Sequence, residues 1–176
     1  MNITMTTTDT ALPVSTSVHV VRADYANPTH AAALVYLLDA YARDPMGGAH
    51  PLSDFAKANL VSALAARPQA YSVLAFDGEL ALGLVNCIEG FSTFACRPLV
   101  NVHDVAVLAS HRGQKVAEKM LVMAESWAVE RGACKMTLEV LQGNGGAYRL
   151  YQRLGFANYQ LDPAMGQAQF MQKWLD

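Results

Sequence analysis

Residues 102–121 constrain the fold of this chain more than any other stretch. Their first part carries the β-branched and apolar residues of a strand, and their last part repeats apolar residues at helical spacing. A short turn separates the two parts, and the helix opens on Arg-Gly-Gln-Lys-Val-Ala at residues 112–117. The first N–H groups of a helix have no partner within it and lie at the positive end of its dipole. The junction therefore predicts a site for a phosphate group.

Composition and charge exclude several classes of protein. The chain has 176 residues, of which 52% are hydrophobic and 16% charged, as is typical of a well-packed globular domain. Its net charge of −2 lacks the basic excess of a nucleic-acid-binding protein. No apolar run approaches the roughly 20 residues that span a bilayer, so we expect no membrane partner. Cys87, Cys96 and Cys134 match no metal-ligand spacing, which predicts no metal site and a reducing cytoplasm.

The pattern indicates one domain after a short leader. Residues 1–17 are rich in threonine and serine and lack the basic start and apolar core of a signal peptide. We expect a flexible leader there, followed by a single domain over residues 18–176. Periodicity, caps and turn residues predict helices at 28–43, 55–66, 112–131 and 144–154. The same signals predict strands at 18–23, 71–76, 79–88, 99–108, 135–141, 156–161 and 169–174.

Two motifs, about 30 residues apart on the expected elements, resemble the GNAT superfamily of acyl-CoA-dependent N-acyltransferases. The family's phosphate loop is Gln/Arg-x-x-Gly-x-Gly/Ala, and this chain matches it at Arg112 and Ala117 but carries Lys115 at the usual glycine. The second signature, Asn-x-x-Ala-x-x-Leu-Tyr-x-x-x-Gly-Phe, is matched in full over residues 144–156. Phe-Ser-Thr-Phe at residues 91–94 further resembles the polyamine and small-amine acetyltransferase branch.

The resemblance implies an α/β GNAT-like fold with a mixed, mostly antiparallel sheet of six to seven strands and about four helices on both faces. The sheet is expected to splay at its centre, between strands 99–108 and 135–141, and to admit the pantetheine arm of acetyl-CoA as co-substrate. The implied cofactor-binding residues are Val105, Ala106 and Val107 through their backbone, Arg112, Gly113, Gln114, Lys115, Val116 and Ala117 around the pyrophosphate, and Asn144 and Ala147 on the other side of the arm.

Lys115 is the departure from the family pattern, and it allows three interpretations. A glycine or alanine suits a backbone that approaches an anion closely, so the lysine could obstruct that approach. Its side chain could instead point outward and add a positive charge beside the phosphates. The third interpretation is a solvated surface lysine in a protein that binds the cofactor poorly.

Acyl transfer to an amine needs a group that accepts a proton and a group that donates one. By resemblance, Tyr151 donates a proton to the leaving thiolate, and the alternative is a tyrosine that only packs between helix and sheet. For the base, His103 occupies the position of a glutamate in the small-amine branch, and an imidazole titrates near neutrality. Glu89 at the end of the preceding strand is the second candidate, and a chain of waters without a single base is the third.

The predicted acceptor pocket is acidic and aromatic, which suits a small cationic amine. Its candidates are Tyr36, Asp39 and Tyr41 on the first helix, Asp44 in the loop after it, Phe91, and Asp104. The first-helix residues equally fit an ordinary helix with an exposed acidic edge, and Phe91 equally fits a core or dimer contact. In a regular strand Asp104 would lie on the opposite face from His103, where it could attract a cationic substrate or cap a turn.

The resemblance implies an N-acetyltransferase that moves an acetyl group from acetyl-CoA to a primary amine of a small molecule, by direct attack in a ternary complex. Two alternatives stay open: an acyl-CoA-binding sensor or scaffold without catalysis, and an acetyltransferase of protein lysines or N-termini. We expect no nucleic-acid partner, and the apolar surplus allows a homodimer.

Overall fold

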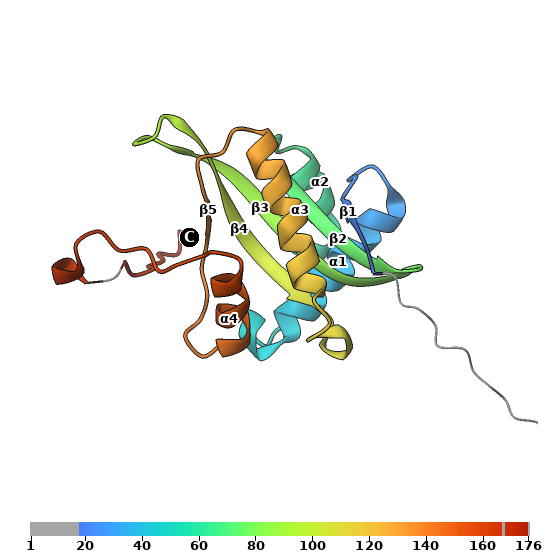
Figure 1. The fold of residues 1–176 in the computed structure, drawn as a ribbon. Coiled ribbons are helices and arrows are strands. Elements are labelled where there is room, and N and C mark those ends of the chain that lie inside the picture. The colour runs from blue at the N-terminus through green and yellow to red at the C-terminus, as the bar shows by residue number, and fades with distance from the viewer. Residues whose placement is uncertain (1–17, 167, 176) are drawn as a thin grey trace, which may run out of the picture.

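The structure is a computed structural model that describes residues 18–166 and 168–175 (Figure 1). The leader predicted over residues 1–17 lies outside these residues. Within them, one sheet of five strands runs in the order β1-β2-β3-β4-β5. Strands β1 to β4 pair in antiparallel fashion, and β4 pairs with β5 in parallel. The strands are β1 (His19–Arg22), β2 (Ala70–Asp77), β3 (Leu80–Ser92), β4 (Arg97–Val107) and β5 (Met136–Leu138).

The helices of the described residues are α1 (Pro28–Arg43), α2 (Asp54–Ala65), α3 (Val116–Glu130) and α4 (Gly145–Arg153), with short 3-10 turns η1 (Pro45–Gly47), η2 (Ala109–His111) and η3 (Pro163–Met165). Helices α1 and α2 begin where capping residues predict, whereas the helix predicted from residue 112 begins at Val116, because Gly113 and Lys115 have positive φ angles. The Asn27 side chain accepts the Thr29 N–H at 2.9 Å and so caps α1. Ser53 Oγ accepts the Ala56 N–H at 3.1 Å and caps α2. Side-chain capping therefore confirms the predicted starts of both helices.

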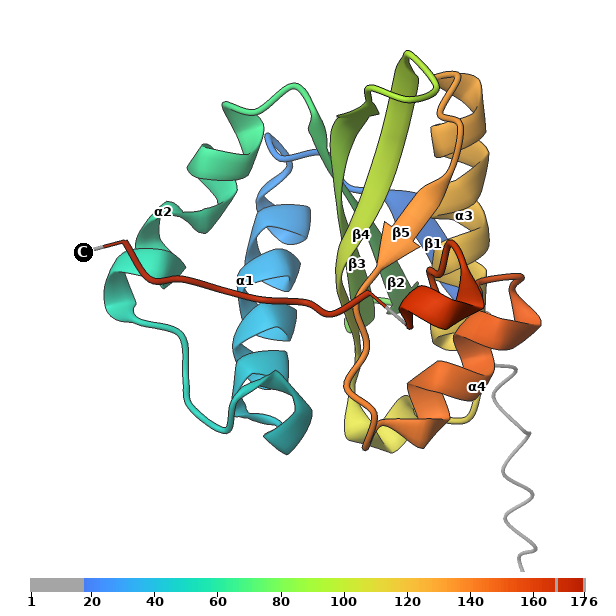
Figure 2. The ribbon, with the colours of Figure 1, turned by 90° about the vertical axis from the view of Figure 1, so that its left-hand side faces the viewer.

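The sheet lies between two helical layers. Figure 2 shows α1 and α2 on one side and α3 on the other. On the α3 side, Met120 and Ala124 pack against a cluster of sheet residues that includes Val85 and Val100. On the α1 side, a second cluster is Ala23, Ala33, Leu34, Leu37, Leu74, Phe76, Ala81, Leu84 and Ala106. Because both faces of β2 and β3 are covered, these strands are almost continuously apolar rather than alternating.

The sheet has five strands within the described residues, so the prediction of six to seven was wrong. Residues 156–161 and 169–174 form no strand, and the strand predicted over 135–141 is reduced to Met136–Leu138. Alternating apolar residues favour an extended chain, but a strand also needs a neighbouring edge to pair with. The chain beyond α4 instead forms no strand among the described residues and crosses toward α2 (Figure 2), and many of its apolar side chains stay exposed, with Trp174 at 82%.

Gly83 in β3 marks a place where the backbone and α3 come too close for a side chain. A Cβ added there would lie 2.7 Å from the Ala106 carbonyl oxygen and 2.8 Å from Met120 Cε. Gly90, on the same strand, would meet only Leu99, at an ordinary 3.5 Å. Substituting Gly83 tests both the close packing and the loss of a strand glycine, whereas substituting Gly90 tests only the loss of the glycine.

We expect Gly83→Ala to lower the free energy of unfolding by about 1–3 kcal/mol, because β4 or Met120 must move to relieve the contact. The matched variant Gly90→Ala should change it by less than about 1 kcal/mol. Urea unfolding followed by circular dichroism measures both. Equal stability of the two variants would contradict the close packing at Gly83.

Candidate active site

A β-bulge in β4 lies at the edge of the site. Asn86 pairs with Asp104 and Cys87 with Val102, so His103 is an extra residue with no partner on β3. The bulge breaks the regular alternation on which the opposite placement of His103 and Asp104 depended. As a consequence, Val102 before the bulge and Val105 after it lie on the same face of the sheet. Both pack in the cluster under α3.

Strand β4 parts from β5 soon after pairing with it. The parallel ladder covers only Val100–Val102 on β4 and Met136–Leu138 on β5. At the far end of β4, the Leu108 N–H donates to the Leu82 carbonyl in β3 at 2.8 Å. Backbone groups of successive residues point to opposite edges of a strand, so those of Val105 and Val107 face away from β3, into the gap. Their direction is the one predicted for backbone that binds a pantetheine arm.

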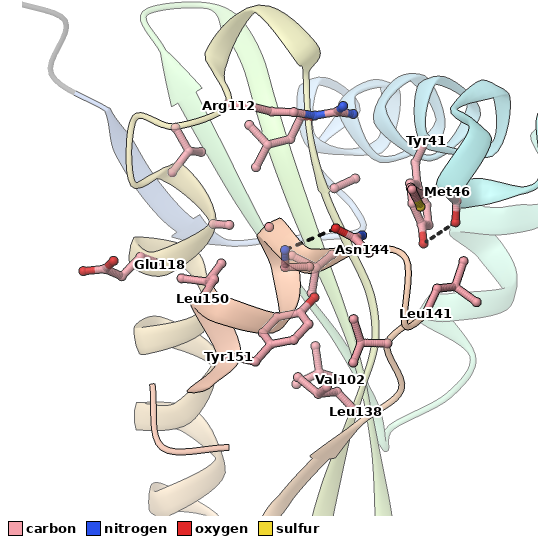
Figure 3. Close-up of a pocket in the computed structure, with 18 of the residues that line it drawn as sticks. Tyr41, Met46, Val102, Arg112, Glu118, Leu138, Leu141, Asn144, Leu150 and Tyr151 are labelled. Atoms are coloured by element: carbon pink, nitrogen blue, oxygen red, sulfur yellow. Dashed lines mark hydrogen bonds between the residues drawn. The ribbon is translucent and has the colours of Figure 1, made fainter. Parts of the chain in front are cut away.

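A cavity of about 640 Å³ occupies the space between the parted strands (Figure 3), a size suited to a small-molecule ligand. Its floor and sides are β4, the chain after β5, the start of α3, and α4. The predicted residues that line it are His103, Val105, Ala106, Val107, Arg112, Gly113, Lys115, Val116, Ala117, Asn144, Ala147, Tyr151, Tyr41 and Asp44. The structure therefore brings most of the predicted cofactor-binding residues around one space.

One mouth of the cavity is the uncapped start of α3. Gly113 and Lys115 have positive φ angles of 77° and 60°, so the loop turns sharply into the helix. Lys115 makes no side-chain cap, and among the described residues the Val116, Ala117 and Glu118 N–H groups donate to no acceptor. Free amides at a helix start, with a lysine beside them, are donors that suit an anion. We call this opening the α3 mouth. Gln114, also predicted there, does not line the cavity; its side chain donates to the Ser110 carbonyl.

Arg112 joins the α3 mouth to the loop after α1. Its Nη2 lies 2.8 Å from Asp44 Oδ2, and its Nε donates to the Val107 carbonyl at 3.1 Å. The hydrogen bond from Arg112 holds the pKa of Asp44 below its ordinary value. The other Asp44 oxygen accepts the Met46 N–H and starts η1. Arg112, which was predicted to bind the cofactor, thus forms an ion pair with Asp44, which was predicted to bind the acceptor.

Tyr151 on α4 lies deep in the cavity wall. Its side chain is 8% exposed and packs edge-on against Phe156, and Figure 3 shows it between α4 and the parted strands, near Val102. Burial raises the pKa of Tyr151 to about 12, so the phenol keeps its proton at ordinary pH. Asn144 accepts the Ala147 N–H at 3.2 Å and thereby caps the helix that carries Tyr151.

The two candidate bases lie in different places. His103 lines the cavity and is solvent-exposed. Glu89 does not line the cavity. Its carboxylate is paired with Arg131 at the end of α3, and the Arg131 guanidinium lies over the Trp127 ring. The geometry therefore brings His103, and not Glu89, to the cavity.

The predicted acceptor residues divide in the same way. Asp44 and Tyr41 line the cavity, whereas Tyr36, Asp39 and Phe91 do not. Asp39 is occupied by Arg43 and Lys57, and these contacts lower its pKa. Asp104 is not on the wall either; it lies between two lining residues and accepts a hydrogen bond from Asn86.

Sequence reasoning missed several apolar residues of the wall. They come from the loop after α1, the chain around β5, and α4, and include Met46, Leu138, Val140, Leu141 and Leu150. Phe170, from the chain beyond α4, also reaches the cavity. The apolar residues Leu138, Val140 and Leu141 were a usable signal, because they follow the strand expected opposite β4 and so lie beside the gap.

Two features are absent from the described residues. Residues 18–166 and 168–175 contain no group of three or more histidine, cysteine or acidic side chains placed to hold a metal ion. In the same part of the chain, no helix combines the length and the apolar character needed to cross a bilayer.

The fold is that of solved acetyltransferases. A probable acetyltransferase superimposes with a TM-score of 0.74 at 22% identity, covering 90% of this chain and 99% of the other. An aminoglycoside N-acetyltransferase in complex with CoA gives a TM-score of 0.70 at 20% identity, covering 93% and 99%. At such identities the likeness establishes the fold alone.

The sequence establishes the family. The model of the acetyltransferase (GNAT) family matches residues 34–156, so this chain belongs to that family, and the resemblance seen in the two motifs is confirmed. Streptothricin acetyltransferase of Streptomyces lavendulae is 33% identical over 91 residues, which are 50% of this chain and 48% of that protein. The streptothricin acetyltransferase of Escherichia coli is 34% identical over 73 residues, covering 42% and 41%. The chain thus matches less than half the length of these relatives.

The φ of 60° at Lys115 gives a stability prediction. We expect the Lys115→Gly protein to be more stable than the Lys115→Ala protein by up to about 1 kcal/mol in free energy of unfolding. Only glycine adopts this conformation without a Cβ clash. Both variants lose the same charge, so urea unfolding isolates the backbone term. A Lys115→Ala protein as stable as Lys115→Gly would contradict the left-handed conformation.

Proposed function

We propose that this protein is an N-acetyltransferase that moves an acetyl group from acetyl-CoA to a primary amine of a small molecule, by direct attack in a ternary complex. The observation that carries the proposal is the cavity between β4 and β5, with free helix-start amides at its mouth and Tyr151 in its wall. Membership of the GNAT family supports it, as do the streptothricin acetyltransferases among its relatives.

The residues present fit acetyl-CoA. The α3 amides and Lys115 suit the pyrophosphate, because they combine hydrogen-bond donors with positive charge. The apolar wall, with Val102 and Leu138 at its centre, suits a pantetheine arm. The outward backbone of Val105 can pair with the amides of that arm as a neighbouring strand would.

Acetyl-CoA, when bound, supplies an acetyl group as a thioester, and the CoA thiolate is the leaving group. A backbone N–H of Val105 or Val107 would donate to the thioester oxygen as negative charge develops on it. The amine nitrogen forms a bond to the carbonyl carbon while the carbon–sulfur bond breaks. Tyr151 would donate a proton to the departing sulfur, which its raised pKa permits across the neutral range.

The attacking amine must also lose a proton, because only its neutral form is nucleophilic. We assign this role to His103, which lines the cavity and is open to solvent, with a chain of waters as the alternative. Glu89 lies outside the cavity and is not part of the proposal.

We place the acceptor amine at the α1 side of the cavity, where Tyr41 and Asp44 line it. A carboxylate and an aromatic ring both attract an ammonium group, so a polyamine-like or antibiotic amine suits this side. We further propose a cytoplasmic location, which the three free cysteines of the chain support.

The proposed activity is tested by incubating the full chain with acetyl-CoA and a panel of amines that includes streptothricin and sisomicin. We expect release of free CoA thiol together with an acetylated amine of the corresponding mass. Binding of acetyl-CoA without thiol release would instead indicate a sensor. Acetylation only of added peptides would indicate a protein acetyltransferase.

Tyr151→Phe tests the proton donor. We expect it to lower kcat by about 100-fold, because the ring stays and only the donated proton is lost. The Kd for acetyl-CoA, measured by calorimetry, should stay nearly unchanged. Since the pKa of Tyr151 is raised to about 12, the wild-type rate should show no alkaline loss from this group up to about pH 10.

Tyr148→Phe is the matched control on the same helix, where the hydroxyl contacts Asn158 at 3.3 Å on the exposed side. It should keep the wild-type kcat. A Tyr151→Phe protein with nearly normal kcat would remove Tyr151 from the chemistry.

A further inference from the structure

Three polar residues lie opposite one another on neighbouring strands of an otherwise apolar sheet face. Ser72 on β2 pairs with Asn86 on β3, and Asn86 pairs with Asp104 on β4. Ser72 is 0% exposed and Asn86 5%, and their strand neighbours Leu74 and Leu84 belong to the cluster under α1. Buried polar groups destabilise a fold unless they are hydrogen-bonded, so this row is not explained by packing.

The row is a continuous hydrogen-bonded chain that begins at Tyr25. Ser72 Oγ donates to Asn86 Oδ1 at 2.6 Å, and Asn86 Nδ2 donates to Asp104 Oδ2 at 2.9 Å. The reverse amide orientation would place its oxygen against the carboxylate. Because the Ser72 hydroxyl proton is used, the Tyr25 hydroxyl must be the donor in its 3.0 Å contact with Ser72 Oγ.

All the donors therefore point the same way, toward Asp104. Hydrogen bonds aligned in a chain polarise one another, and the positive end of this chain lies at a carboxylate. Burial raises the pKa of the Tyr25 phenol, which keeps its proton on the donor at neutral pH. The arrangement directs a donor at Asp104 and holds one of its two carboxylate oxygens in place.

The β4 bulge is what brings Asp104 into the row. Cys87 pairs with Val102, so an unbroken ladder would place His103 opposite Asn86. The extra residue moves the register by one and sets the carboxylate there instead. The same bulge leaves His103 at the cavity wall.

Asp104 lies beside the acceptor end of the cavity, near Tyr41. Its neighbours His103 and Val105 line the cavity, and so does Ala106 on the same sheet face. Burial raises the pKa of Tyr41, and the nearby charges of Asp104 and Asp44 raise it further. Asp44 is engaged by Arg112, whereas Asp104 makes no ion pair among the described residues.

We infer that Asp104 anchors the ammonium group of the acceptor, and that Tyr25, Ser72 and Asn86 are positioning residues that hold its carboxylate turned to the cavity. This inference rests on the proposed function and deepens it, since it assigns the acceptor as a cation. The second oxygen of Asp104 faces the ammonium while the chain holds the first.

Steady-state kinetics with streptothricin as acceptor test this inference. Asp104→Asn keeps an oxygen that accepts from Asn86 but removes the charge. We expect its KM for streptothricin to rise about 10-fold or more, with the KM for acetyl-CoA changed less than about 2-fold. Tyr25→Phe removes only the first donor, and its KM for streptothricin should rise about 2- to 5-fold. Tyr148→Phe is the control and should change neither constant.

A double-mutant cycle separates positioning from a structural effect. If Tyr25 acts through Asp104, Tyr25→Phe should change the KM little when Asp104→Asn is already present. Equal effects in both backgrounds, or an unchanged KM in Asp104→Asn, would overturn the inference while leaving the acetyltransferase intact. Thermal unfolding checks that each variant is folded. If the Asp104→Asn protein is not folded, the KM of Tyr25→Phe for streptothricin alone decides the inference. A wild-type protein that neither binds nor acetylates any amine of the panel would overturn the proposed function and this inference together.

Discussion

The parting of β4 from β5 is the constraint on which the rest of this structure depends. The two strands pair over Val100–Val102 and then separate, so backbone groups of Val105 and Val107 face a cavity instead of a neighbouring strand. An open sheet edge inside a protein must find other polar partners. In this family member the parted edge, the start of α3 and the short helix α4 surround one space, and each contributes a different chemical group to it.

Charge is distributed around that space in two regions. The α3 mouth offers amides and Lys115, and the α1 side offers Asp44, with Asp104 next to the lining residues His103 and Val105. Arg112 connects the regions through its ion pair with Asp44. Because this arginine is about half exposed, the pair contributes little stability by itself, and its importance lies in joining two loops that are far apart in sequence.

Local signals predicted the elements whose starts and turns are made by neighbouring residues. Asn27, Ser53 and the turn after Asp77 each act within a few positions along the chain, and the helices and the hairpin follow them. The last two predicted strands failed, because alternation of apolar residues says nothing about which edge is free to pair. Glu89 and Asp39 illustrate the same limit, since each is occupied by a basic side chain that spacing alone did not bring to it.

The sequence by itself determined the family, the strand-turn-helix that leaves free amides at its helix start, and the presence of Tyr151 on a capped short helix. These features depend on residues that lie close together in the sequence, where backbone geometry restricts the local structure that can form. Only the tertiary structure decided that a bulge sets Asp104 against Asn86, that His103 reaches the cavity, and that the sheet stops at five strands within the described residues. Register and pairing depend on contacts between distant segments, and a one-residue shift reverses which side chain faces the site.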